Sequence, residues 1–158
     1  MKLKSPRESM VEMTELVLPN DTNMLGNLLG GKLMHLVDVA GAMAAQRHSN
    51  KIVVTAAIDS VEFKRPVKAG EIVTLKAKVT WVGRTSMEVA VEVFSENYMT
   101  AERQFTNKAY LTFVAVDQQS KPAEVCGLLV ETEEEKVEYE AAAKRRCERL
   151  KSRADTRV

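Results

Sequence analysis

A single carboxylate stands in the middle of an apolar, helix-like stretch of this chain. Asp38 follows Leu36 and Val37 and precedes Val39 and Ala40. Burying a carboxylate is costly unless a partner compensates for the lost water, so an acid in these surroundings should have a purpose. In an apolar cleft it could activate a water molecule or attack an acyl group directly. The residues alone leave both roles open, together with that of a buried aspartate that only bonds a neighbour.

A polar loop with two glycines leads into this stretch. Asn23 carries an amide that could orient a water molecule or a carbonyl group, although loop asparagines often stabilise only their own turn. Gly30 and Gly31 stand at the expected start of a helix, where backbone N–H groups carry partial positive charge. Such groups could bind a developing oxyanion, so the loop and Asp38 together have the parts of an acyl-transfer site.

Cations near expected turns could bind phosphate. Arg84 lies in a short turn, residues 83–86, whose N–H and hydroxyl groups could join its guanidinium around a phosphate. Lys64 precedes another turn, and Arg145 near the C-terminus could reach a ligand of a neighbouring subunit. The alternative for each cation is an exposed charge that only keeps the protein in solution, and this alternative is weaker for Arg84.

The two histidines offer a second chemistry. His35 lies three residues before Asp38, so the two side chains would project from roughly the same side of a helix. A His–Asp pair would suit a dehydratase or hydratase, but neither a serine nor a cysteine nucleophile is placed beside this histidine. We expect His35 to be structural and His48 to be a solvated loop residue.

Length, charge and cysteine content narrow the class of protein. The 158 residues are 45% hydrophobic and 28% charged, which is typical of one globular domain with its own core. A formal net charge of +1 disfavours a broad nucleic-acid surface. The two cysteines, Cys126 and Cys147, have no metal-ligand spacing, so we expect neither a metal site nor a disulfide framework. With no apolar run of signal-peptide or transmembrane length, we expect a cytoplasmic protein without a membrane partner.

The periodicity of apolar residues predicts the elements that would position these groups. Residues 10–18 read as a strand, and the turn-forming residues after them end it. From about Gly30 to Arg47 apolar residues follow helical spacing nearly all round, so we expect this helix to be buried on most sides. Four later stretches read as strands, at 52–63, 71–82, about 87–93 and about 103–116.

Alternation in the later strands indicates an antiparallel sheet with one wet face. In the strand at 71–82, the apolar residues 73, 75, 77 and 79 share one face with Trp81. A capping-box pattern at 132–135 begins a C-terminal surface helix at about 131–152. We therefore expect an α+β fold, a single domain over 1–158 with its core at about 10–117. A curled antiparallel sheet of about five strands would surround one long buried helix.

Three ordered motifs carry a resemblance to a known family. The first is the loop and helix Asn23-x-x-Gly26-Asn27-x-x-Gly30-Gly31-Lys32-Leu33-Met34-x-x-x-Asp38-x-Ala40-Gly41. The other two are Phe63-Lys64-Arg65-Pro66-Val67-x-x-Gly70 and Val82-Gly83-Arg84-Thr85-Ser86-Met87. They resemble motifs of hotdog-fold acyl-CoA thioesterases, in the branch that includes bacterial short-chain acyl-CoA hydrolases and the brain cytosolic acyl-CoA hydrolase. The resemblance runs from about Val11 to Val116.

The resemblance implies a hotdog fold and the metal-independent hydrolysis of acyl-CoA to a free fatty acid and CoA, without a cofactor. It implies a homodimer that joins two sheets and has its sites at the subunit interface, often within a homohexamer built as a trimer of dimers. It implies catalytic roles for Asp38, Asn23 and Gly31. The residues that it implies for substrate and CoA binding are Gly30, Thr55, Lys64, Pro66, Val67, Gly83, Arg84, Thr85, Ser86 and Arg145.

Two alternatives to hydrolysis stay open. One is a non-catalytic hotdog module that senses acyl-CoA or a nucleotide. The other is a hotdog dehydratase or hydratase, which would need His35 in a catalytic position. The preferred acyl-chain length does not follow from the sequence.

Overall fold

The computed structural model describes residues 2–59, 61 and 63–156, and one antiparallel sheet dominates it. The sheet has five strands in the order β1-β3-β4-β5-β2. The strands are β1 (Val11–Leu16), β2 (Ile52–Ile58), β3 (Ile72–Val82), β4 (Ser86–Asn97) and β5 (Glu102–Val116). The helices are α1 (Pro6–Ser9), α2 (Gly30–Ser49) and α3 (Glu133–Thr156), and a 3-10 turn, η1, spans Pro19–Asp21.

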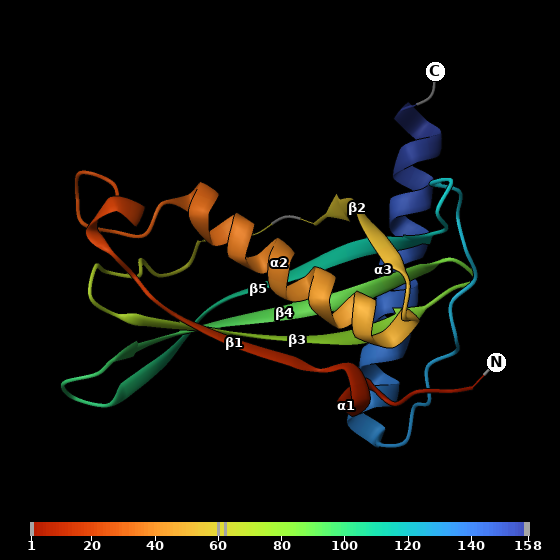
Figure 1. Cartoon of the computed structure of the whole chain (residues 1–158), viewed down its shortest axis with the longest axis horizontal. Helices are drawn as coiled ribbons and strands as arrows, with labels where there is room; N and C mark the ends of the chain where they lie inside the picture. The colour runs from red at the N-terminus through yellow and green to blue at the C-terminus, as the bar shows by residue number, and fades with distance from the viewer. Residues whose placement is uncertain (1, 60, 62, 157–158) are drawn as a thin grey trace.

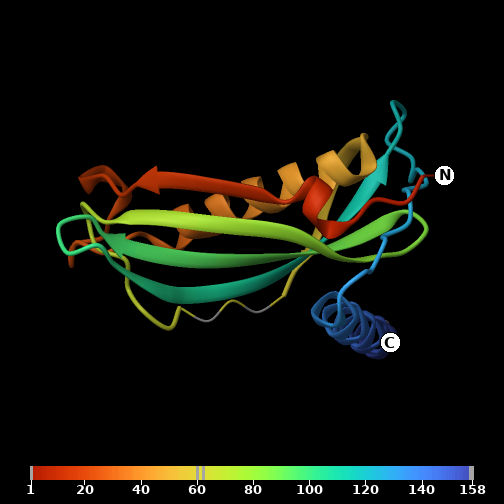
Figure 2. The same cartoon turned by 90° about the horizontal axis from the view of Figure 1, so that it is seen from below.

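The two long helices lie on opposite faces of the sheet. α2 runs along the face around which the sheet curls (Figure 1). Figure 2 shows α3 on the other side, near the end of the sheet where the N-terminus lies. Because β2 is the last strand of the sheet, one of its edges is unpaired within the described chain. This arrangement confirms the predicted sheet of five strands around one long helix.

Small residues let α2 approach the sheet closely. Leu36, Val37 and Ala40 are buried between helix and sheet, and full burial of a Leu or Val side chain contributes about 1.5–3 kcal/mol. A Cβ atom on Gly41 would lie 3.1 Å from the ring of Phe113 on β5. A larger residue at this position would therefore push the helix away from the strand that pairs with β2.

One prediction about α2 is wrong, because the helix is not buried on most sides. Gly30, Gly31 and His35 are exposed, and Asp38 and Val39 are half-buried. The sheet curls around one side of the helix, so the residues of the other side face outward. His35, expected to be structural, is therefore not part of the core.

Two strand ends and one side-chain direction differ from the sequence prediction. β2 ends at Ile58 rather than near residue 63, with residues 60 and 62 outside the described part, and β4 continues to Asn97. A bulge after Val79 brings Trp81 opposite Glu88 and under Arg146 of α3, whose guanidinium lies 4.6 Å from the ring. Trp81 therefore faces α3 rather than the core. The sheet face that was expected to contact solvent is covered by α3 at this point, since Glu88 is 0% exposed.

His48 lies in the last turn of α2 and is fully buried, so the prediction of a solvated loop residue is wrong. Its Nε2 donates to the carbonyl oxygen of Cys126 at 2.9 Å. Burial of the imidazole lowers the pKa of His48, and the bond to Cys126 opposes this shift less strongly. Protonation would add a hydrogen to Nδ1, which is buried and has no partner among the described residues.

The protein should therefore lose stability on mild acidification. The folded-state pKa of His48 lies below its ordinary value of 6.5, so the unfolded chain takes up the proton first and stability falls as the pH drops below that value. His48→Gln keeps an N–H donor for Cys126 but cannot titrate. Urea unfolding between about pH 7.5 and pH 5.5 should show a smaller loss of unfolding free energy in this variant. Equal losses in both proteins would contradict this role of His48.

Candidate active site

Asp38 and Thr55 form a direct contact between α2 and β2. The Thr55 hydroxyl donates a hydrogen bond to Asp38 Oδ1 at 2.7 Å. A bulge between Thr55 and Ala57 interrupts the pairing of β2 with β5 at this point, and bulges often aim a side chain at a site. Among the described residues Thr55 is the one hydrogen-bond donor to this carboxylate, so Oδ2 remains for a water molecule or a substrate. Because Asp38 is half-buried, a polar ligand can reach it.

Asn23 builds its own turn with its side-chain oxygen. Oδ1 accepts N–H bonds from Leu25 at 3.0 Å and from Asn27 at 3.1 Å, and Gly26 takes a positive φ of 77° within the turn. These bonds do not use the amide nitrogen of Asn23, and the residue is exposed. One side chain thus combines the turn-stabilising role with a donor that a ligand could use.

The Asn23 loop and the start of α2 line a cavity of about 290 Å³. Four residues singled out from the sequence lie together there: Asn23, Gly30, Pro66 and Val67. The ring of Phe63 also lines it, 3.4 Å from where a Cβ atom on Gly30 would lie. α2 begins without a side-chain cap, and no described atom lies within 4 Å of a Cβ built on Gly31. The backbone N–H groups at this helix start are therefore open to a ligand.

Within one chain this cavity and Asp38 are separate. Asp38 does not line the cavity, and the helix rises about 12 Å between Gly30 and Asp38. The structure therefore separates the predicted catalytic residues. Asn23 and Gly31 lie in the loop before α2 and at its start, and Asp38 lies further along the helix beside Thr55, which was predicted to bind substrate.

The cations predicted to bind phosphate differ in their exposure and in the contacts that they make within the chain. The Arg84 side chain is 80% exposed, and its Nη1 lies 4.0 Å from Glu124. Lys64 is exposed as well. Both cations are therefore placed to meet a ligand from solution.

The backbone of the turn at 83–86 joins β3 to β4 and holds β5. The N–H of Gly83 donates to the Ser86 carbonyl at 2.8 Å, and the Thr85 carbonyl accepts the N–H of Ala115 at 2.9 Å. The Ser86 hydroxyl accepts a hydrogen bond from Arg146 at 3.0 Å. Several hydrogen-bond donors and acceptors of this turn are therefore already bonded within the chain.

Arg145 is paired within the chain. Its guanidinium donates to both oxygens of Glu88, at 3.0 and 2.8 Å, and lies 3.7 Å from the ring centroid of Tyr110. Sequence reasoning missed Glu88, because it reads as one of the outward residues of an alternating strand. The sequence did contain a signal for such a partner. Arg145 and Arg149 lie one helical turn apart on the same face of α3, and this spacing indicates an acidic residue that both could contact.

The described residues include neither a cluster of metal ligands nor a membrane-spanning helix. No group of three or more His, Cys, Asp or Glu residues among them is placed to hold a metal ion. None of the described helices is both long and apolar enough to cross a membrane.

Sequence comparison assigns the chain to a known family. A family model described as the thioesterase superfamily matches residues 25–102. An uncharacterized acyl-CoA thioester hydrolase, YkhA of Bacillus subtilis (strain 168), is 44% identical over 143 residues, which are 90% of this chain and 83% of that protein. The chain belongs to the thioesterase superfamily.

Solved structures of thioesterases share the fold of this superfamily member. A crystal structure of an apo-hexameric acyl-CoA thioesterase matches with a TM-score of 0.93 and 45% identity, over 98% of this chain and 99% of that one. An acyl-CoA hydrolase from Staphylococcus aureus, in complex with butyryl-CoA, CoA and CoA disulfide, matches with a TM-score of 0.91 and 36% identity. That match covers 98% of this chain and 94% of the staphylococcal one. These likenesses confirm the hotdog fold and the resemblance to acyl-CoA thioesterases.

Three further structures of an acyl-CoA hydrolase from Staphylococcus aureus carry alanine in place of an asparagine, an aspartate or a threonine. In that protein the aspartate follows the asparagine by 15 residues, and the threonine follows the aspartate by 17. Asn23, Asp38 and Thr55 of this thioesterase-superfamily chain have the same residue types and the same spacing.

Proposed function

We propose that this protein hydrolyses acyl-CoA thioesters to a free fatty acid and CoA. The observation that carries the proposal is the near full-length similarity, at 44% and 45% identity, to an acyl-CoA thioester hydrolase and an acyl-CoA thioesterase. The half-buried Asp38, held by Thr55 at 2.7 Å, supplies a carboxylate for this chemistry.

Asp38 acts on the thioester by one of two routes. As a general base, its carboxylate takes a proton from water while the water oxygen bonds to the acyl carbon. As a nucleophile, it bonds to that carbon itself and forms an anhydride, which water then hydrolyses. In both routes the C–S bond breaks. In the first, the leaving CoA sulfur receives the proton that Asp38 took from water; in the second, it leaves as a thiolate and takes up the proton released when water hydrolyses the anhydride. The hydrogen bond from Thr55 to Oδ1 limits rotation of the carboxylate and keeps Oδ2 available.

The start of α2 supplies the complementary donors. Backbone N–H groups at Gly30 and Gly31 would stabilise the negative charge that develops on the thioester oxygen. The amide nitrogen of Asn23 would orient the water molecule or the carbonyl group. Neither a metal nor a cofactor has a part in this proposal.

A homodimer would bring the two groups together. β2 has an unpaired edge, and its residues Ile52 and Val54 are 60% and 48% exposed. Met24 and Leu25 in the Asn23 loop are 104% and 83% exposed. Exposed apolar residues and an open strand edge both favour association, and two structural neighbours are hexamers. The minimal unit is therefore a dimer in which the loop at 23–31 of one protomer faces Asp38 of the other, assembled further as a trimer of dimers.

Recognition of CoA is assigned to the exposed cations. Arg84, in the turn at 83–86, and Lys64 would contact the phosphates. Arg145 would contribute less, since its guanidinium is bound to Glu88. A cytoplasmic location, without a nucleic-acid or membrane partner, stays a prediction from the sequence.

Thiol release from acyl-CoAs of increasing chain length tests the proposal. We expect continuous release of CoA with an equal amount of fatty acid, unchanged by a metal chelator. Tight binding of acyl-CoA without release would indicate a sensor instead. Addition of water to an enoyl-CoA without thiol release would indicate a hydratase.

A further inference from the structure

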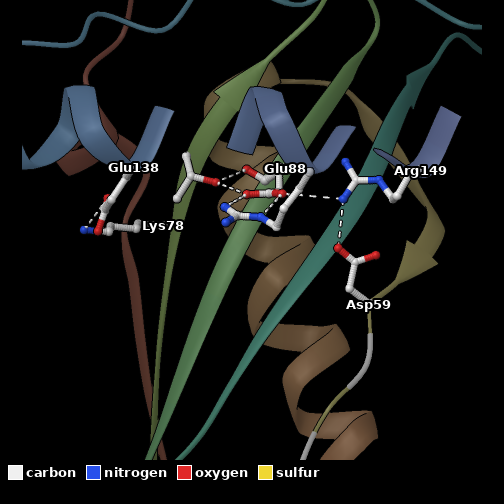
Figure 3. Close-up of polar contacts among 7 residues, drawn as sticks. Asp59, Lys78, Glu88, Glu138 and Arg149 are labelled. Carbon is white, nitrogen blue, oxygen red and sulfur yellow. Dashed lines mark hydrogen bonds and ion pairs between the residues drawn. The ribbon is translucent and has the colours of Figure 1, made fainter. Parts of the chain in front are cut away.

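A buried ion cluster ties the C-terminal helix to the sheet. Glu88 on β4 is 0% exposed, and α3 covers it (Figure 3). Its carboxylate accepts two hydrogen bonds from Arg145, at 3.0 and 2.8 Å, and one from the Thr80 hydroxyl at 2.7 Å. A buried carboxylate is stable when its oxygens are bonded and its charge is paired, so these contacts hold α3 in one place.

Arg149 extends this cluster to the end of β2. Its Nη1 lies 2.8 Å from Asp59 Oδ2 and 3.5 Å from Glu88 Oε2, so one guanidinium bridges two carboxylates (Figure 3). The side chains of Arg149 and Asp59 are 19% and 27% exposed, which makes this pair less screened than one on the surface. With Arg145 the four charged groups sum to zero, and the cluster can stay charged beneath the helix.

β2 is held at this end by its pairing with β5 and by Ile58, which packs against the core. It is an edge strand that pairs with β5 on one side, and the bulge between Thr55 and Ala57 interrupts that pairing. Beyond the bulge, Ala57 and Ile58 pair with β5, and the N–H of Asp59 donates to the Tyr110 carbonyl at 2.9 Å. A short strand segment after a bulge is free to bend unless its end is fixed. The N–H bond to Tyr110 holds the backbone of Asp59 at that end, and the ion pair with Arg149 holds its side chain.

We propose that Arg149 is a positioning residue, which holds Asp59 and thereby keeps the Thr55 hydroxyl against Asp38. The proposal rests on the proposed hydrolase function. Asp59 lies about 13 Å along an extended strand from Thr55, so Arg149 does not touch the reacting atoms. A misplacement of about 1 Å at a catalytic group can lower a rate ~10²-fold. Loss of Arg149 should therefore lower kcat and leave KM nearly unchanged.

Variants of the full chain separate this role from general stability. Arg149→Met keeps the aliphatic stem and removes the charge, and Glu88 retains Arg145 and Thr80 as partners. We expect kcat to fall about 10-fold, KM to change less than about 2-fold, and Arg149→Lys to recover most of the activity.

Glu138→Gln is the matched control on the same helix. It weakens the 2.9 Å ion pair between Glu138 of α3 and Lys78 of β3 (Figure 3). The two side chains are 23% and 25% exposed, much as those of Arg149 and Asp59, but their pair does not involve β2. This variant should keep the kcat of the wild type. A loss of kcat equal to that of Arg149→Met would overturn the proposal, because it would show that any loosening of α3 has the same effect.

Coupling to Thr55 gives the sharpest test. If Arg149 acts through Thr55, the double variant of Thr55→Ala and Arg149→Met should be no slower than Thr55→Ala alone. Losses that multiply, or an unchanged kcat in Arg149→Met, would overturn the proposal.

Hydrogen exchange separates the failure of this inference from the failure of the proposed function. The amides of Ala57 and Asp59 should exchange faster in Arg149→Met than in the wild type or Glu138→Gln, whether or not the protein has activity. If the wild type releases no thiol, the proposed hydrolase function is refuted, whereas the positioning role of Arg149 is not. Unchanged exchange in Arg149→Met would remove the positioning role alone.

Discussion

Asp38→Asn should give a folded protein that binds acyl-CoA but hydrolyses it at least ~10²-fold more slowly than the wild type. Asparagine keeps Oδ1, which accepts the 2.7 Å hydrogen bond from Thr55, so the contact between α2 and β2 survives. The change removes the basic and nucleophilic oxygen that both proposed routes need. Because Asp38 is half-buried and outside the packed core, the free energy of unfolding should change little. Steady-state thiol release measures kcat, and titration with CoA measures binding.

His35→Gln is the matched control for this prediction. His35 lies on the same helix, one turn before Asp38, and is exposed. Its loss should leave kcat near the wild-type value. Near wild-type turnover by a correctly folded Asp38→Asn protein would remove Asp38 from the mechanism. A large loss in His35→Gln alone would favour an imidazole-based reaction.

Mixing two inactive variants should restore activity, because the proposed site is shared between protomers. Asn23 and Asp38 lie in separate groups within one chain, with about 12 Å of helix between Gly30 and Asp38. In a two-fold dimer of one Asn23→Ala chain and one Asp38→Ala chain, one site carries both changes and the other carries neither. Random pairing after mixed refolding should therefore regenerate about a quarter of the wild-type sites. Specific activity measured against each variant refolded alone gives this fraction.

Two additions make the mixing experiment decisive. Different tags on the two chains show that mixed oligomers have formed. Asn23→Asp repeats the test with a variant that retains Oδ1, which accepts the N–H bonds of Leu25 and Asn27 in the wild type. That variant preserves the turn and removes the amide donor. Mixed oligomers without recovered activity would mean that each chain builds its own site.

Patterns local to the sequence were enough to predict the sheet and the long helix, and they also indicated candidate residues for the site. Helical spacing from Gly30 onward and alternation along β3, β4 and β5 depend on near neighbours in the chain, so they can be read without tertiary contacts. The spacing of Asn23 and Asp38 within one motif indicated an acyl-transfer site, and the family comparison confirms the resemblance that those residues carried. The roles of these residues stay predictions.

Features that depend on distant parts of the chain were predicted wrongly or missed. His48 is buried by a partner 78 residues away, and Glu88 pairs with an arginine 57 residues away. Such long-range contacts produce no periodic pattern of residues in the sequence. The bulge after Val79 turned Trp81 toward α3, because an extra residue in a strand moves the next side chain to the other face.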